Sequence, residues 1–169
     1  GNGDEGIVPT NIHSVVIPVV SNQPLVSSNQ IVKSITVQSG AVVDIAVGNT
    51  LTIRDSVTNN GDITGGGSIA LAGTASQPVK GTGNYSNLIL NNSNGAVIAT
   101  GAGNMVTITG RYIPTNGILT TNDNLTLKST ASSTGTIATG PSGGGYINGK
   151  VTMERYIPGR RAWRLINFP

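Results

Sequence analysis

Short apolar runs, each closed by glycine or asparagine after a few positions, constrain this chain more than any other feature. Apolar and polar residues alternate within the runs, as at 51–53 and 125–127, which is the pattern of half-buried strands. Glycine and asparagine tolerate positive φ angles, so pairs such as Asn94-Gly95 permit sharp corners. No stretch keeps apolar residues at helical spacing for three turns. The sequence therefore predicts an all-β fold of very short strands.

Two architectures fit this rhythm: a right-handed parallel β-helix, or β-solenoid, and an antiparallel β-sandwich. The solenoid is favoured because the runs are short even for a sandwich, and because the bulky aromatic residues of sandwich cores make up only 4% of the chain. Gly, Thr, Asn and Ser account for 77 of the 169 residues, and stacked coils let Thr and Asn side chains hydrogen-bond in ranks. With about 20–29 residues per coil, we expect roughly six to eight coils and, at about 4.8 Å per coil, a rod about 30–40 Å long.

Charge is sparse and unevenly placed. Charged residues are 10% of the chain and the net charge is +3, yet residues 1–149 carry five basic and six acidic side chains. A nucleic-acid-binding protein needs a basic face interleaved with aromatic rings, so we expect no nucleic-acid partner. The absence of cysteine excludes disulfides and thiolate metal sites. No apolar run approaches the length of about 18 residues that would span a bilayer, so we expect no membrane span.

Three motifs together resemble a known family. Residues 59–73 read N-N-G-D-I-T-G-G-G-S-I-A-L-A-G, and residues 81–92 read G-T-G-N-Y-S-N-L-I-L-N-N. The tetrapeptide R-Y-I-P occurs at 111–114 and again at 155–158, where R-A-W-R follows it at 161–164. This ordered set resembles the β-solenoid repeats of large secreted proteins from bacteria that use the type IX secretion system. The resemblance implies an extracellular adhesin or stalk, exported by that machinery, and it carries over no catalytic residue.

The chain is expected to be a fragment of a longer protein, with three parts. Residues 1–14 are expected to lead into and cap the first coil, and the coils are expected to continue to residue 149. Residues 150–169 differ in composition, since they hold five of the ten basic residues and the only Trp and Phe. We interpret them as an exit segment that leads into a following domain.

The exit segment supplies the interface candidates. Its arginine and aromatic side chains could bind an anionic partner by charge and stacking. The alternative, which we favour, is that they pack against a neighbouring domain with the arginine stems along aromatic rings. The candidates are Arg155, Tyr156, Arg160, Arg161, Trp163 and Arg164.

Catalytic and metal-binding candidates are few. His13 is the only histidine, and no nucleophile or orienting carboxylate is marked beside it in the sequence. Asp55 and Asp62 would act as a glycosidase pair only if a corner brought them within about 5–10 Å. Asp123 is a candidate Ca²⁺ ligand because it lies among oxygen-bearing side chains, with corner hydrogen bonding as the alternative. We expect no catalytic residue and no cofactor.

These expectations describe a structural or adhesive segment of a secreted or surface-anchored bacterial protein. It would act as a spacer or an interaction surface, with neighbouring domains of the same chain, a surface glycan or end-to-end copies of itself in a filament as partners. The alternatives are the non-catalytic part of a polysaccharide-active solenoid enzyme, which would place several carboxylates on one face, and a carbohydrate-binding module, which would carry an aromatic strip.

Overall fold

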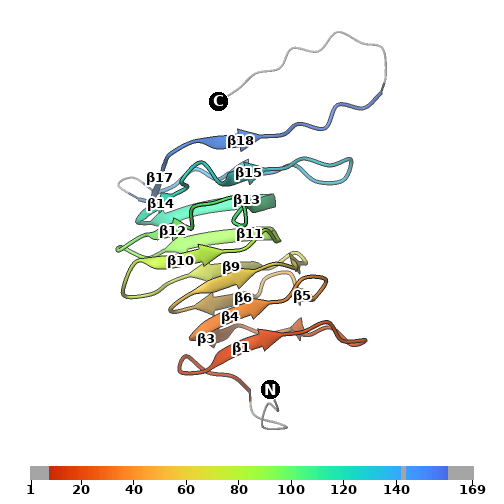
Figure 1. The fold of residues 1–169 in the computed structure, drawn as a ribbon, viewed down its shortest axis with the longest axis vertical. Coiled ribbons are helices and arrows are strands. Elements are labelled where there is room, and N and C mark those ends of the chain that lie inside the picture. The colour runs from red at the N-terminus through yellow and green to blue at the C-terminus, as the bar shows by residue number, and fades with distance from the viewer. Residues whose placement is uncertain (1–7, 142–143, 160–169) are drawn as a thin grey trace.

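The computed structural model describes residues 8–141 and 144–159, which wind into a right-handed parallel β-solenoid of about six turns (Figure 1). Within those residues there is no helix, and every pairing between named strands is parallel. A single antiparallel bridge, from Ser129 to Thr134, closes a loop. The predicted all-β parallel β-helix is confirmed, and the antiparallel sandwich is wrong.

The first three coils each contain three strands separated by sharp corners. The second coil shows the local logic: in β4 (Ser34–Val37), Ile35 and Val37 are buried while Thr36 between them is partly exposed. Alternate side chains point to opposite faces of a strand, so the apolar set lies inside the coil. The other strands of these coils are β1 (Ser14–Ile17), β2 (Leu25–Val26), β3 (Gln30–Val32), β5 (Val42–Ile45), β6 (Thr50–Ile53), β7 (Val57–Asn59), β8 (Asp62–Thr64) and β9 (Ser68–Leu71).

The fourth and fifth coils lack one corner. Gly48 (φ 80°) turns the second coil between β5 and β6, and Gly65 (φ 90°) turns the third between β8 and β9. At this place the fourth and fifth coils have no residue with positive φ, and one long strand takes the place of two. These coils consist of β10 (Gln77–Lys80) with β11 (Asn84–Asn91) and β12 (Ala96–Ile98) with β13 (Val106–Asn116). The later strands are β14 (Ile118–Thr120), β15 (Leu125–Leu127), β16 (Thr136–Ile137), β17 (Tyr146–Asn148) and β18 (Val151–Met153).

The stacked strands form two sheets. One has seven strands in the order β1-β4-β7-β10-β12-β14-β17, and the other has eleven, with its two halves joined through β11 and β13. The spacing between paired residues varies: Gln77 pairs with Ala96, and Ile118 pairs with Tyr146. The strands stay aligned while coil length changes, so the corners absorb the difference.

The core is built from ranks of inward side chains that run along the solenoid. In the seven-stranded sheet Ile35, Val57, Val79 and Ile98 stand in register on successive coils, and all four are buried. Burying an aliphatic side chain contributes about 1.5–3 kcal/mol. Each coil therefore depends on the coils above and below it to exclude water from its apolar face.

Polar side chains in the corners hold neighbouring coils together. The buried Asn59 amide donates to the backbone oxygen of Asn84 in the next coil at 3.0 Å and accepts from the backbone N–H of Gly61 at 3.1 Å. At another corner, buried Gln77 donates to Ile53 oxygen at 3.0 Å and accepts from the Asn92 amide at 3.0 Å. Buried polar groups are costly unless they are hydrogen-bonded, so these amides belong at the corners, where backbone groups are free to pair.

Close stacking also explains a glycine. A Cβ atom on Gly61 would lie 2.2 Å from the backbone oxygen of Ala41 in the preceding coil. Only a residue without a side chain fits there, because real Cβ atoms do not approach an oxygen so closely.

Backbone pairing continues beyond residue 149, where we expected the solenoid to end. β18 pairs in parallel with β15, Leu125 with Val151 and Leu127 with Met153. The N–H of Glu154 still donates to Leu127 oxygen at 2.9 Å. The start of the expected exit segment is therefore part of a further coil.

Candidate functional site

Two of the six interface candidates lie in the described part of the chain. The Arg155 guanidinium donates to Gly135 oxygen at 3.1 Å and to the Ser129 hydroxyl at 3.4 Å, so it packs against the loop of the preceding coil. Tyr156 is 51% exposed and its neighbour Ile157 is 53% exposed. Arg160, Arg161, Trp163 and Arg164 lie outside the described residues, and their interface role stays a prediction.

Asp123, the candidate Ca²⁺ ligand, has protein partners on both carboxylate oxygens. One accepts the backbone N–H of Lys150 at 3.0 Å, and the other lies 3.6 Å from the Lys150 ammonium. Asp123 itself has a φ of 64°, and its N–H donates to the Thr121 hydroxyl at 3.2 Å. Across residues 8–141 and 144–159, no group of three His, Cys, Asp or Glu residues is placed to hold a metal ion. This arrangement is the corner hydrogen bonding named as the alternative reading of Asp123.

The remaining acid–base candidates lie apart. His13 bonds within its own turn, where Nδ1 is 2.9 Å from the Thr10 hydroxyl. Asp55 follows β6 and accepts from the Ser34 hydroxyl at 3.3 Å, whereas Asp62 begins β8 and accepts from the Asn84 amide at 2.6 Å. The whole of β7 separates the two aspartates, and they line different surface hollows.

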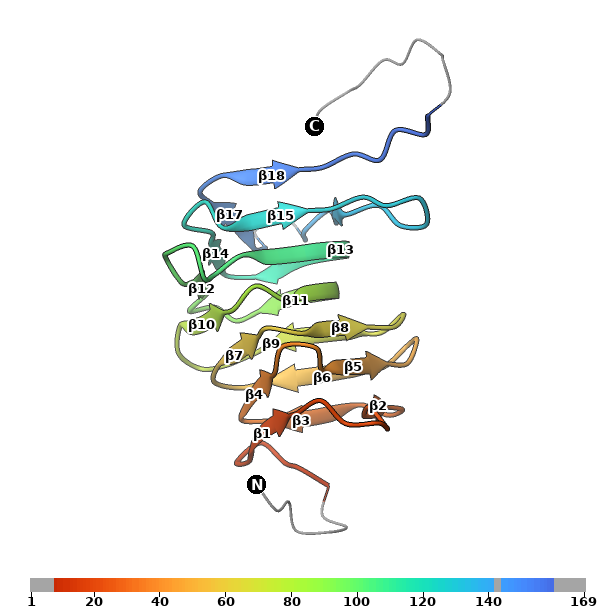
Figure 2. The same cartoon turned by 45° about the vertical axis from the view of Figure 1, so that its right-hand side comes forward.

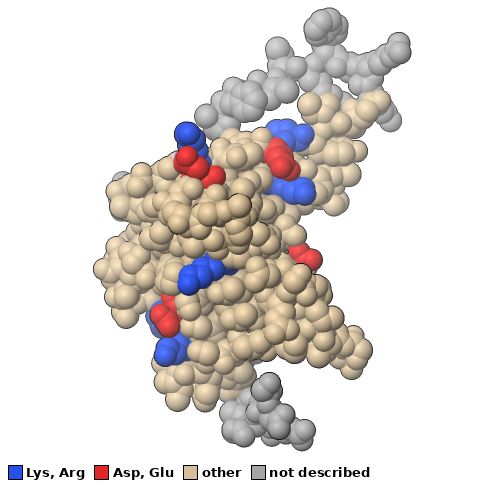
Figure 3. All heavy atoms as spheres, viewed as in Figure 1, with Lys and Arg blue, Asp and Glu red and all other residues tan. Residues whose placement is uncertain are grey.

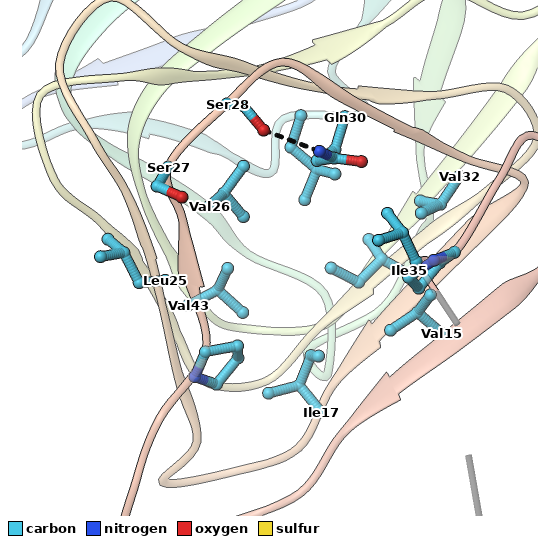
Figure 4. A pocket seen from close by; sticks show the side chains of 14 residues that line it. Val15, Ile17, Leu25, Val26, Ser27, Ser28, Gln30, Val32, Ile35 and Val43 are labelled. Carbon is cyan, nitrogen blue, oxygen red and sulfur yellow. Dashed lines mark hydrogen bonds between the residues drawn. The ribbon is translucent and has the colours of Figure 1, made fainter. Parts of the chain in front are cut away.

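The N-terminal end of the solenoid holds an apolar hollow of about 470 Å³ (Figure 4). Ile17, Val26 and Val43 project into it from strands β1, β2 and β5, and the only hydrogen bond drawn across its rim joins Gln30 to Ser28 at 2.9 Å. Among the described residues, β1, β2 and β3 each pair with one strand only, so this end also presents unpaired strand edges. Among the described residues, the hollow is the N-terminal end of the core.

The lost corners of the fourth and fifth coils create a second feature, which we call the notch. Its floor is the middle of β11 and β13, and its lips are the corner at 64–67 and the loop at 128–135. Figure 2 shows the loops after β8 and β15 extending further outward than the ends of β11 and β13. The notch encloses about 510 Å³.

The floor of the notch is irregular. Two residues of β13, Thr109 and Gly110, oppose the single Ser86 of β11, which is a β-bulge. The Asn87 side chain connects three coils at this point by hydrogen bonds. It donates to Gly67 oxygen at 2.8 Å and accepts from the N–H of Arg111 at 2.9 Å. The Ser86 hydroxyl is buried and has no hydrogen-bond partner. The bulge therefore leaves one polar group in the floor unsatisfied.

The lining of the notch is polar and nearly neutral. It contains one carboxylate, Asp62, one ammonium, the exposed Lys128, and one aliphatic residue, Ile63. The other residues supply hydroxyl, amide and backbone groups. The Asn84 amide fixes the Asp62 carboxylate through the 2.6 Å bond. Sequence analysis missed the notch because it arises from corners that are absent, and no motif marks an absent corner.

Comparisons of the chain with models of protein families, with curated proteins and with solved structures found no match. In the described part of the chain, no helix is long and apolar enough to cross a membrane. A functional proposal therefore rests on the geometry of the molecule and on the sequence patterns described above.

Proposed function

We propose that this chain is a structural and adhesive β-solenoid segment of a secreted or surface-anchored bacterial protein, where it acts as a spacer and an interaction surface. The observation that carries the proposal is the continuity of the stack. One seven-stranded sheet and one core rank after another run through every described coil. In such a linear array each coil contacts only its neighbours, so length is added without a larger globular core.

The nature of the surface supports an extracellular setting. Figure 3 shows charged atoms in small, scattered groups on a face that is otherwise uncharged. A single ion pair, Lys150 with Asp123, occurs among the described residues. The outer wall is instead dominated by neutral Thr, Ser and Asn side chains, as the composition requires. The resemblance to repeats of type IX secretion proteins points to the same location.

The N-terminal end supports contact with a neighbouring domain or with another copy of the chain. Of the twelve exposed large hydrophobic side chains among the described residues, half belong to the first coil and the segment before it. Exposed apolar patches of this kind mark interaction sites. These side chains are Val8, Ile12, Val16, Val19, Val20 and Leu25.

The carbohydrate-enzyme and aromatic-module alternatives gain less support. Asp55 and Asp62 lie in different hollows. The exposed aromatic side chains among the described residues, Tyr146 and Tyr156, lie on β17 and after β18 and form no strip. We therefore retain the structural and adhesive role.

Two experiments test the proposal. Antibodies against the purified chain should label intact cells or detect the protein in spent medium, and labelling that requires cell lysis would contradict an extracellular role. Pulling single molecules by their ends should release the solenoid coil by coil. A coil of 22 residues, the spacing from Val57 to Val79, extends by about 70–80 Å. A spacer role would be contradicted if all coils unfolded in one step at a very low pulling force.

A further inference from the structure

We propose that the notch binds a segment of a neutral glycan, with the Asp62–Asn84 pair as its central hydrogen-bonding element. This inference rests on the interaction-surface role proposed above, and it names the ligand class and the place on the surface. The notch and the end hollow differ in chemistry, since the end hollow is lined mainly by aliphatic side chains and the notch by polar ones.

The shape of the notch suits an extended chain. The two lips, at 64–67 and 128–135, stand on either side of a floor made by two neighbouring strands. Its volume of about 510 Å³ falls within the range of roughly 300–1,000 Å³ that is usual for ligand sites. The space between the lips can therefore accommodate a segment of a polymer.

The Asp62–Asn84 pair offers two fixed acceptors side by side. The Asn84 amide nitrogen donates to one carboxylate oxygen of Asp62, which orients both side chains. The second Asp62 oxygen and the Asn84 side-chain oxygen make no hydrogen bond within the described part of the chain. Two neighbouring acceptors match the two adjacent hydroxyl groups of a sugar ring, each of which donates one hydrogen bond.

The donors lie on the floor and on the opposite lip. The Lys128 ammonium comes from the loop after β15, and so do the Thr130 and Ser133 hydroxyls, which lie 3.0 Å apart and share one hydrogen bond, leaving one hydroxyl proton for a ligand. The floor adds the second N–H of the Asn87 amide, since the first donates to Gly67 oxygen. A ligand rich in hydroxyl groups can accept from these donors while it donates to the Asp62–Asn84 pair.

The charge balance selects against other ligands. One carboxylate faces one ammonium, so the notch has no net charge to attract a nucleic acid or an acidic polysaccharide. A single carboxylate is a poor set of ligands for a divalent cation. No aromatic ring lines the notch, so we expect a weak dissociation constant, on the order of 1 mM per site.

The test is a nuclear magnetic resonance titration of the full chain with defined hexasaccharides: cellohexaose, maltohexaose, chitohexaose, xylohexaose and mannohexaose, with oligogalacturonate as an anionic comparison. We expect at least one neutral probe to shift the backbone amide signals of residues 62–64, 84–87 and 109–110. The variants Asp62→Asn and Asn84→Ala should weaken that binding at least fivefold. Asp55→Asn is the matched control, because it changes an aspartate outside the notch, and it should bind like the parent chain.

Every outcome of the titration is informative. If no neutral probe shifts the notch amides, or if only oligogalacturonate does, the inference is wrong. Binding that Asp62→Asn and Asn84→Ala leave intact, in variants whose amide spectra show a folded solenoid, also overturns it. If either variant does not fold, Lys128→Ala, at an exposed side chain, decides the matter by the same loss of affinity. Labelling of intact cells without sugar binding would remove the glycan and keep the surface role. Sugar binding by a protein that is found only inside cells would support the glycan site and contradict the surface role.

Discussion

The buried hydroxyl of Tyr112 leads to the sharpest prediction about stability. Tyr112 pairs with the buried Leu88 on one side and with the exposed Ile137 on the other. Its side chain is fully buried, and its hydroxyl has no hydrogen-bond partner. The substitution Tyr112→Phe removes only that oxygen and leaves the packed ring in place. We therefore expect Tyr112→Phe to be more stable than the parent chain.

The size of the gain follows from the environment. A buried polar group without a partner costs about 1–3 kcal/mol. In a chain of this length each kcal/mol moves the melting temperature by roughly 2–4 °C, so the variant should melt at least about 2 °C higher. The measurement is the thermal transition followed by circular dichroism, together with hydrogen exchange of the amides in β11 and β13. Exchange should slow in these two strands first, because each coil depends on its neighbours.

Two comparisons show what would refute this reasoning. Tyr146→Phe, at a side chain that is 59% exposed, should leave the melting temperature unchanged. Tyr85→Phe should also raise the melting temperature, because the buried Tyr85 hydroxyl likewise has no hydrogen-bond partner. A melting temperature for Tyr112→Phe that falls by several degrees would mean that the hydroxyl is satisfied by a buried water, and the reasoning would fail.

Three further predictions follow from the same structure. Gly61→Ala should destabilise the chain by about 1–3 kcal/mol in a denaturant titration, since the new Cβ would clash with Ala41 oxygen. Gly103→Ala is the control, because Gly103 has open space around it, and it should leave stability unchanged. Equal effects of the two substitutions would contradict the close-stacking argument. Burial raises the pKa of both Tyr85 and Tyr112 well above the ordinary value of about 10. The unfolded chain therefore loses these protons first, so the contribution of the two tyrosines to stability should be constant below about pH 10 and fall above it by about 1.4 kcal/mol per pH unit for each tyrosine. In Tyr112→Phe the slope above pH 10 should be about half as steep, and an unchanged slope would show that Tyr112 does not contribute. Addition of Ca²⁺ at millimolar concentration should leave the melting temperature unchanged, because the Asp123 carboxylate is occupied by Lys150; a rise that Asp123→Asn abolishes would restore the metal site.

Local patterns were sufficient to predict the fold class. The alternation at 51–53 and the Asn-Asn-Gly corner at 59–61 are visible within a few residues, and both are reproduced in β6 and at the corner after β7. The prediction of stacked polar ranks also rested on local composition. It agrees with Thr36 and Thr58, which stand in register on neighbouring strands.

Features that depend on what lies in the next coil could not be predicted. The tetrapeptide R-Y-I-P shows this most clearly. In β13 its tyrosine, Tyr112, is buried between strands on both sides, whereas the tyrosine of the second copy, Tyr156, follows β18 and is 51% exposed. The sequence is the same, and the burial differs because, among the described residues, only the first copy has strands paired on both sides. The notch escaped prediction for a related reason, because it requires two short coils between two with projecting loops.

The variable spacing of the coils has a consequence for how such a chain changes during evolution. Successive coils keep their strands aligned although the distance between paired residues is 19 at Gln77–Ala96 and 28 at Ile118–Tyr146. Insertions and deletions at a corner therefore leave the hydrogen-bond register of the coils on either side untouched. Mutation can lengthen or shorten the projecting loops, such as the one at 128–135, one coil at a time. Each change alters the outer surface, while the backbone hydrogen bonds between the stacked strands stay the same.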